Sequence, residues 1–270
     1  MKLSFIDLFA GCGGLSLGLE QAGFTPVYVN ELNSDALNTY LVNRSEFKYL
    51  NDKDFHSNEI KELTGNKNNL EKLSKNLKTK FNISKGELTL IVGGPPCQGY
   101  SGIGHRRNYK VDKKEIPSNY LYKEMIKVIK HFNPKGYIFE NVRGLLSARW
   151  TKNGKKGEIF EDVLKQFKTL KNYNFEYSLV QCKDYGVPQN RPRVILIGIR
   201  KDIVSNLNKE KLFPKKDISY PNLEDLLGDL IDINYNKNFQ TNKYLKNPKT
   251  KTQKMLRTKK NGKTILKKGE

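Results

Sequence analysis

The sequence is poor in the residues that build disulfide frameworks, metal sites and membrane spans. Its 270 residues include three histidines and three cysteines, Cys12, Cys97 and Cys182, and none of them has metal-ligand spacing. An odd number of scattered cysteines also disfavours a disulfide framework and indicates a reducing compartment. No apolar run approaches the ~18 to 20 residues that a membrane span needs. The N-terminal apolar stretch is interrupted early by glycines, so it does not resemble a signal peptide.

Acidic residues are scarce relative to basic ones. The chain has 49 Lys and Arg against 28 Asp and Glu, a formal net charge of +21. Residues 241–270 alone carry eleven basic side chains and one acidic side chain. This excess favours a polyanionic partner, because phosphate contacts dominate the affinity of proteins for nucleic acids. An ordinary lysine-rich surface and a solvated disordered tail are the alternatives.

Strand-like and helix-like segments alternate through the first 200 residues. This alternation, with several strands apolar throughout, predicts an α/β fold with a mostly parallel sheet and helices on both faces. Ser34 is the expected N-cap of the second helix. The periodicity fades beyond about residue 205, so we expect a domain at 1–205 followed by a basic segment at 206–270. The expected strands cover residues 3–9, 26–30, 88–92, 136–141, 175–180 and 194–199, and the expected helices cover residues 14–22, 35–42, 57–80, 120–132 and 159–170.

A glycine-rich loop follows the first expected strand, in the segment DLFAGCGG. Glycines such as Gly11 and Gly13 let a nucleotide-like ligand approach the backbone. Ser16 occupies the third glycine position of the dinucleotide pattern, which disfavours a dinucleotide site. Glu31 ends the second strand, where a carboxylate can accept hydrogen bonds from ribose hydroxyls. Together they suggest an adenosine-containing cofactor, and a tight turn beside an exposed glutamate is the alternative.

A second loop, GGPPCQGYS, places Cys97 directly after two prolines at the end of a buried strand. A free cysteine is usually packed and inert, but the polar, glycine-rich residues after it suit a mobile loop better than a core. Glu140 ends the next strand, so we expect it beside Cys97, where a carboxyl group among apolar neighbours can act as an acid. Arg191 and Arg193 precede the last strand and add two guanidinium groups.

In their order and spacing, DLFAGCGG, Asn30-Glu31, GGPPCQGYS, ENV and QNRPR resemble the motifs of the DNA (cytosine-5) methyltransferases. The resemblance covers roughly residues 3–200 and implies the Rossmann-like fold of S-adenosylmethionine-dependent methyltransferases. It further implies a soluble enzyme in the cytoplasm of a bacterial or archaeal cell. Methylation would serve a restriction-modification system and would act on a base flipped out of double-stranded DNA.

The resemblance also implies roles for individual residues. Cys97 would be the nucleophile that attacks carbon 6 of cytosine, and Glu140 would contact N3 and the amino group of the base. Arg193 would hold the exocyclic oxygen of the base, with Arg191 as its neighbour. The remaining residues would bind S-adenosylmethionine: Phe9 beside the adenine, Glu31 at the ribose, an aspartate after the third strand at the adenine amino group (Asp54, with Asp52 as the alternative), and Gly11, Gly13 and Pro96 along the cofactor.

Two later motifs of the family, an R-x-L-T segment and a G-N-x-V segment, have no counterpart in residues 201–270. We therefore expect the basic segment to be the start of an incomplete target-recognition region. A two-chain enzyme, a truncated gene and an artificially shortened chain would each explain this, and the first would require a second polypeptide carrying the missing motifs. A tRNA cytosine-5 methyltransferase and a non-catalytic DNA-binding or cofactor-binding remnant are the alternative functions.

Overall fold

The computed structural model describes residues 3–96, 113–204, 212–216, 221–231, 243–259, 262–267 and 269. The chain forms two compact units. The first comprises Met1–Val180 and Pro192–Pro214, and the second comprises Gln181–Arg191 and Lys215–Glu270. The sequence suggested one boundary near residue 205, whereas the second unit also takes the last residue of β6 and the ten residues between β6 and β7.

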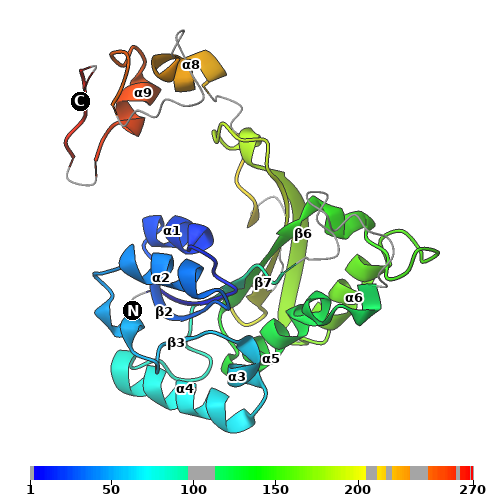
Figure 1. Ribbon diagram of the computed structural model, residues 1–270. Helices are drawn as coiled ribbons and strands as arrows, with labels where there is room; N and C mark the ends of the chain where they lie inside the picture. Colours follow the sequence, from blue (N-terminus) through cyan, green and yellow to red (C-terminus); the bar gives the residue numbers. More distant parts are fainter. Residues whose placement is uncertain are drawn as a thin grey trace. The chain divides into compact units, whose positions relative to one another are not determined.

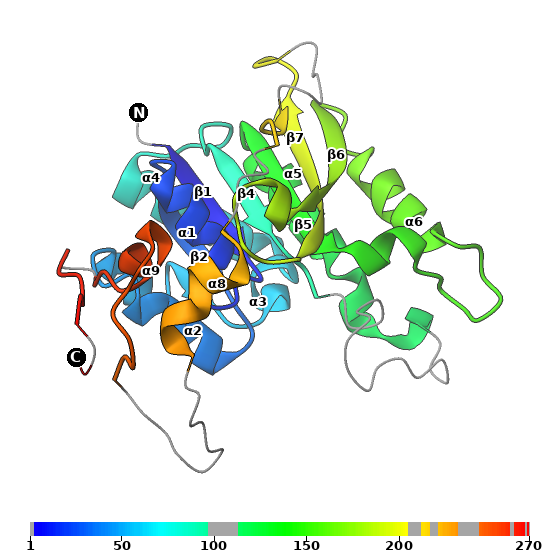
Figure 2. The ribbon, with the colours of Figure 1, turned by 90° about the horizontal axis from the view of Figure 1, so that it is seen from above.

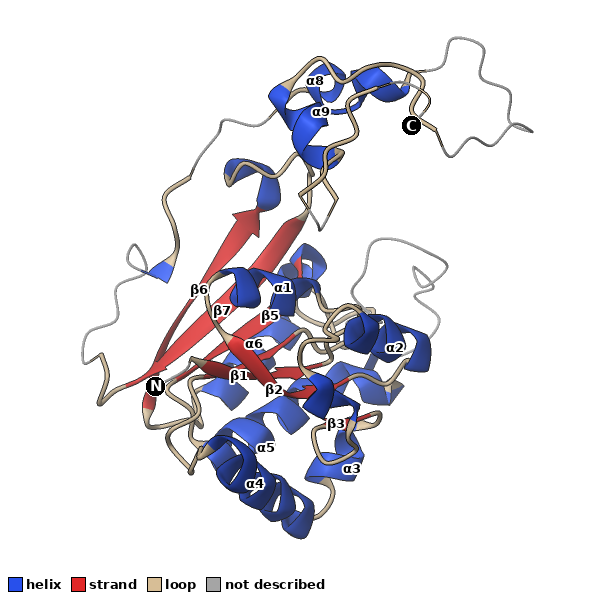
Figure 3. Cartoon of the chain, turned by 90° about the vertical axis from the view of Figure 1, so that its left-hand side faces the viewer, coloured by secondary structure: helices blue, strands red, loops and turns tan. Residues whose placement is uncertain are grey.

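The first unit is built on a seven-stranded sheet in the order β3-β2-β1-β4-β5-β7-β6 (Figure 3). The five strands from β3 to β5 are parallel, and β7 is antiparallel to β5. The expectation of a mostly parallel sheet is confirmed. The strands are β1 (Ser4–Leu8), β2 (Thr25–Asn30), β3 (His56–Ser57), β4 (Leu90–Gly93), β5 (Gly136–Val142), β6 (Tyr173–Gln181) and β7 (Pro192–Arg200).

Helices cover both faces of this sheet. Figure 1 shows α1 and α2 on one face and α3, α4 and α5 on the other, and in Figure 2 α1 lies over β2, which it contacts. The α2 helix is capped by Asn33, whose side chain accepts a hydrogen bond from the Ala36 N–H at 2.9 Å, and not by Ser34 as expected. The α-helices of this unit that lie wholly within the described residues are α1 (Gly14–Gln21), α2 (Ser34–Val42), α3 (Ile60–Thr64), α4 (Lys67–Phe81), α5 (Tyr122–Phe132) and α6 (Glu158–Phe167).

The central strands have apolar side chains on both faces because helices cover both. Every residue of β1 is buried, and α5 buries Met125, Val128 and Ile129 on its apolar stripe. At the amino ends of the strands, Arg200 ties two loops together by donating hydrogen bonds to the carbonyl oxygens of Gly86 and Asn133, at 2.8 and 2.7 Å.

The described residues of the second unit form two short α-helices, α8 (Leu223–Leu227) and α9 (Lys251–Leu256). A capping box of Thr250 and Gln253 begins α9. Arg257 forms a buried ion pair with Asp229, 2.5 Å between Nη2 and Oδ2, so residues 243–259 are folded and the alternative of a disordered tail is wrong for them.

Within the described ranges, no helix combines the length and apolar character that crossing a bilayer requires. The same part of the chain has no group of three or more His, Cys, Asp or Glu side chains placed to hold a metal ion.

Candidate active site

The candidate site lies where parallel strands end along one edge of the sheet. The pairing register places Ser57, Asn30, Leu8, Gly93 and Phe139 in one row across the five parallel strands. The residues that follow this row therefore lie at the same edge of the parallel strands, where ligands bind in open α/β sheets, although β5 itself continues to Val142 beside β7. They are Asn58, Glu31, Phe9, Gly94 and Glu140.

The loop after β1 has an unusual backbone. Phe9, Gly11 and Gly13 all have positive φ angles, of 59°, 57° and 86°. For Phe9 this conformation is strained, and such strain is found most often at functional sites. A Cβ atom placed on Gly11 would meet no atom within 4 Å. The backbone at Gly11 therefore borders open space that a ligand can enter.

Glu31 holds this loop through its carboxylate. The N–H groups of Gly11 and Asn33 donate hydrogen bonds to Oε2 and Oε1 of Glu31, at 2.7 and 2.9 Å. A carboxylate has about four acceptor positions, so two of them can still receive ribose hydroxyls. The glutamate expected at a ribose thus also shapes the loop beside it.

Asp54 does not occupy the position expected of it. It precedes β3, and the residue that follows this strand is Asn58, whose amide donates to the Glu31 carbonyl oxygen at 3.3 Å. Asp54 instead forms an ion pair with Lys72 on α4, at 2.8 Å, and Asp52 also lies before β3. The Lys72 ammonium lowers the pKa of the exposed Asp54 carboxyl group.

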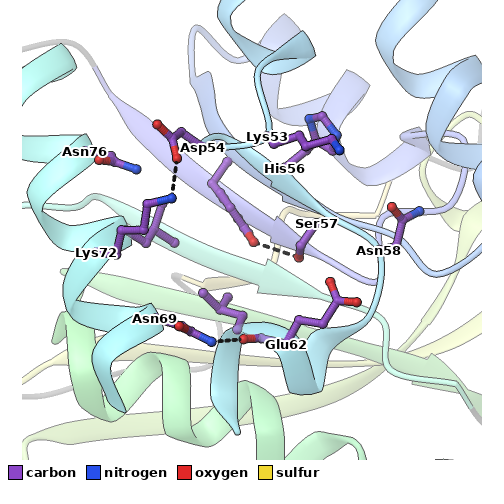
Figure 4. A pocket seen from close by; sticks show the side chains of 12 residues that line it. Lys53, Asp54, His56, Ser57, Asn58, Glu62, Asn69, Lys72 and Asn76 are labelled. Atoms are coloured by element: carbon purple, nitrogen blue, oxygen red, sulfur yellow. Dashed lines mark hydrogen bonds and ion pairs between the residues drawn. The ribbon is translucent and has the colours of Figure 1, made fainter. Parts of the chain in front are cut away.

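Asp54 and Lys72 line a groove of about 430 Å³ between β3 and the helices α3 and α4 (Figure 4). Tyr28, Ser57 and Asn58 also line it, whereas Glu31 and the glycine loop do not. The opposite charges of Asp54 and Lys72 are paired across it.

Glu140 and Arg193 meet at the end of β5. Glu140 Oε1 lies 2.6 Å from Arg193 Nε, and the two side chains are 28% and 17% exposed, so a ligand can reach both. The sequence suggested that Glu140 has apolar neighbours, but the charged Arg193 side chain lies against it. A Cβ atom on Gly94 would lie 2.9 Å from Glu140 Oε2, so the strand end that leads toward Cys97 passes directly against this carboxylate.

The turn before Cys97 is fixed by Asn141. The buried Asn141 amide donates to the Pro95 carbonyl oxygen at 3.1 Å, which ties the end of β4 to the end of β5. Pro96 is half-buried beside it. Cys97 itself, the predicted nucleophile, lies outside the described residues.

Arg191 belongs to the second unit, where its side chain is exposed, whereas Arg193 lies in β7 of the first unit. The two arginines of the QNRPR motif therefore fall in different units.

Sequence reasoning gave no role to Asp7, which lies inside β1 and is fully covered. Ser16 donates a hydrogen bond to Asp7 Oδ2 at 2.5 Å, and the Ser16 hydroxyl lies 2.8 Å from that of Tyr40. Burial raises the pKa of Asp7 to about 7, although the Ser16 hydrogen bond and the Arg44 charge act in the opposite direction. The signal available in the sequence was an acidic residue that stands among the apolar residues Phe5, Ile6 and Leu8 of one strand.

Comparisons with known proteins agree on one family. A family model of C-5 cytosine-specific DNA methylases matches residues 3–269. The Type II methyltransferase M.DdeI of Desulfomicrobium norvegicum is 31% identical over 258 residues, which cover 94% of this chain and 55% of the relative. M.FnuDI of Fusobacterium nucleatum is 35% identical over 233 residues, covering 86% and 56%.

Solved structures give the same result. The crystal structure of a protein assigned as a DNA modification methyltransferase, encoded within an E. coli prophage, superposes with a TM-score of 0.62 at 27% identity. The match covers 86% of this chain and 56% of that one. The chain thus spans about half the length of the curated relatives it matches.

Proposed function

The chain belongs to the C-5 cytosine-specific DNA methylase family, and from this premise we propose that it forms the catalytic part of a DNA (cytosine-5) methyltransferase. The enzyme would transfer a methyl group from S-adenosylmethionine to carbon 5 of cytosine in double-stranded DNA. Relatives that are Type II methyltransferases support a place in a restriction-modification system, in the cytoplasm of a bacterial or archaeal cell.

The observation that carries the proposal is the row of strand ends. Phe9 and Glu31, which are predicted to bind the cofactor, lie in register with Gly94, which leads toward Cys97, and with Glu140, which is predicted to serve the cytosine. A methyl donor and its acceptor must lie side by side, because the reacting atoms have to approach within about 3 to 3.5 Å. The position of both groups of residues at one sheet edge supports the proposal.

The residues that follow β1 and β2 are suited to bind S-adenosylmethionine. The open side of Gly11 can face the cofactor, and Glu31 keeps acceptor positions for its ribose. The N-cap of helix α1 is Gly13, which has no side chain to cap the helix, so the first N–H groups of α1 can receive the cofactor carboxylate. Phe9 would pack beside the adenine. We assign the adenine edge to the backbone and side chain near Asn58, and not to Asp54.

The loop after β4 and the neighbouring residues of β5 and β7 are suited to bind a flipped cytosine. The Cys97 thiolate would form a bond to carbon 6, which shifts ring electrons toward carbon 5. Glu140 would hold N3 and the amino group and favour that shift, while Arg193 would hold the exocyclic oxygen. S-adenosylmethionine would supply the methyl group to carbon 5 and leave as S-adenosylhomocysteine. A base would then remove the carbon-5 proton, so that the 5,6 double bond re-forms and the bond between the Cys97 sulfur and carbon 6 breaks.

The relatives extend beyond the part that this chain matches. The chain corresponds to about half of its relatives' length, and it lacks the R-x-L-T and G-N-x-V segments. We propose that a second polypeptide supplies them and, with them, recognition of the DNA sequence. The basic residues 243–267 would contact DNA phosphates without discriminating between sequences.

A methyl-transfer assay tests the proposed function. The chain alone and the chain with a polypeptide carrying both segments are incubated with duplex DNA or with tRNA and labelled S-adenosylmethionine. We expect 5-methylcytosine in DNA only when both polypeptides are present. Glu140→Gln should slow the reaction by roughly two orders of magnitude, whereas Glu161→Gln on the surface should not. Methylation of tRNA alone would favour the RNA enzyme. No transfer under any condition would favour a non-catalytic remnant.

A further inference from the structure

Arg44 has an unusual position for an arginine, because it is buried directly beneath the glycine loop. It follows the end of α2, and only 4% of the residue is exposed. Its Nη2 group donates a hydrogen bond to the Gly13 carbonyl oxygen at 2.8 Å. Its Nε group pairs with Glu20 Oε1 on α1 at 2.5 Å, which neutralises the buried charge.

From this geometry we propose that Arg44 is a positioning residue for the glycine loop and sets its affinity for the cofactor. This inference rests on the proposed function, because it takes the loop to be the S-adenosylmethionine site. Arg44 would not touch the cofactor. It would act through the Gly13 carbonyl group.

The two glycines of the loop have different purposes in this arrangement. A Cβ atom on Gly13 would lie 2.5 Å from Arg44 Nη1 and 2.7 Å from the Tyr40 ring, whereas one on Gly11 would meet nothing within 4 Å. Gly13 therefore makes room for the arginine on the inner side of the loop. Gly11 leaves the outer side open for a ligand.

The Gly13 carbonyl group is the point where the loop becomes a helix. It also accepts the hydrogen bond of the Leu17 N–H at 2.9 Å, the first bond of α1. The Gly13 N–H in turn donates to the Ala10 carbonyl oxygen at 3.0 Å. A change in the position of this one peptide group would therefore move both the loop and the start of the helix.

Arg44 is itself held rigidly by α2. Its guanidinium carbon lies 3.8 Å from the centre of the Tyr40 ring, and Nη1 donates to the Tyr40 carbonyl oxygen at 3.3 Å. The Tyr40 hydroxyl group is fixed by Ser16, which is bonded to Asp7 on β1. The loop is thus supported from a second helix and from the strand that precedes it.

The first unit also offers a matched control. Arg200 makes the same kinds of contact, two hydrogen bonds to backbone carbonyl oxygens and an ion pair with Asp202 at 2.7 Å. It makes them at the amino ends of the strands, away from the candidate site. Arg200→Gln therefore removes comparable structural contacts without affecting the glycine loop.

The test compares affinity with stability. Titration calorimetry measures the dissociation constant of S-adenosylhomocysteine, the demethylated cofactor, for the wild-type chain, Arg44→Gln and Arg200→Gln, and thermal unfolding is followed in parallel. We expect Arg44→Gln to weaken binding tenfold or more. Arg200→Gln should leave the dissociation constant within about twofold of wild type, even if its melting temperature falls as far as that of Arg44→Gln.

Wild-type affinity in Arg44→Gln would overturn the inference, as would losses of affinity that simply follow the melting temperature in both variants. If Arg44→Gln does not fold, Arg44→Lys replaces it, because lysine keeps the charge but cannot contact both Gly13 and Glu20 as the guanidinium does. Several-fold weaker binding would support the role, and unchanged binding would refute it. A wild-type chain that binds no cofactor would instead contradict the proposed function.

Discussion

At the scale of single residues, Asp7 is a carboxyl group whose surroundings strongly change its acid–base behaviour. It is enclosed at the base of the glycine loop, with one hydrogen bond from Ser16 and no contact with solvent. Burial raises its pKa to about 7 from an ordinary value of 3.8. The carboxyl group is therefore protonated in the folded state at pH 5, where it would be ionised in the unfolded chain.

This difference predicts a dependence of stability on pH. The folded state binds more protons than the unfolded state between about pH 4 and 7, so the wild-type chain loses stability as the pH rises through that range. The amide group that replaces the carboxyl group in the Asp7→Asn variant does not titrate. From pH 5 to pH 8, the free energy of unfolding of this variant should therefore rise relative to wild type by about 2 to 3 kcal/mol.

Urea unfolding followed by the fluorescence of Trp150, the only tryptophan of the chain, measures this change in the first unit. Asp202→Asn is the control. The pKa of Asp202 is lowered by Arg200, so its effect on stability is lost only in more acidic solution and should be constant over this range. An Asp7→Asn difference that is equally constant would mean that Asp7 is ionised throughout.

Residues also show where the sequence was insufficient. The carboxyl group at Glu31 could be placed because it ends a long apolar strand. Asp54 could not, because β3 has only two residues and gives no periodicity from which its ends can be located. The aspartate expected after this strand therefore lies before it. Asn141 stood within a recognised motif, but its hydrogen bond to Pro95 depends on the pairing of β4 with β5, which no local pattern encodes.

At the scale of elements, the predicted and observed helices agree where apolar residues repeat regularly at helical spacing. Helix α5 was expected at residues 120–132 and spans Tyr122–Phe132, because its apolar side chains repeat at helical spacing. The expected 57–80 segment divides into α3 and α4, separated by Gly65 and Asn66. The helices α8 and α9 were missed because each is shorter than two full turns, too short for a periodic pattern.

The second unit is held together by a contact that sequence patterns do not reveal. Arg257 and Asp229 lie 28 residues apart, both are buried, and the Arg257 guanidinium carbon lies 3.7 Å from the centre of the Tyr244 ring. Removing one member of such a pair leaves an uncompensated charge in the interior, which typically costs about 3 to 5 kcal/mol.

We therefore predict that Asp229→Asn selectively loosens the second unit. Amide hydrogen exchange in residues 243–259 should accelerate by about two orders of magnitude, the equivalent of roughly 3 kcal/mol. Glu161→Gln, which breaks an exposed ion pair with Lys155, should leave exchange there unchanged. Equal exchange rates in Asp229→Asn and wild type would show that the buried pair does not stabilise this unit.

At the scale of the whole molecule, the alternation of strands and helices was sufficient to predict the sheet, its parallel strands and the edge that carries the loops. The two-unit arrangement was not predictable from the sequence, because Gln181–Arg191 belong to the same unit as Lys215–Glu270, which begins more than twenty positions later in the chain. The row of strand ends from Asn58 to Glu140 follows from the strand register, so it became visible only with the fold.

The central claim is that Cys97, delivered by the Pro95-Pro96 turn beside Glu140, attacks a flipped cytosine. Duplex DNA containing 5-fluorocytosine tests it most directly, because fluorine replaces the proton whose removal releases the enzyme and so traps the covalent complex. The two-polypeptide assembly is incubated with this DNA and S-adenosylmethionine, digested, and analysed by mass spectrometry. The adduct should lie on the peptide that contains Cys97, should be lost in Cys97→Ser, and should persist in Cys12→Ser and Cys182→Ser. An adduct on Cys12 or Cys182, or methyl transfer that survives Cys97→Ser, would contradict the account.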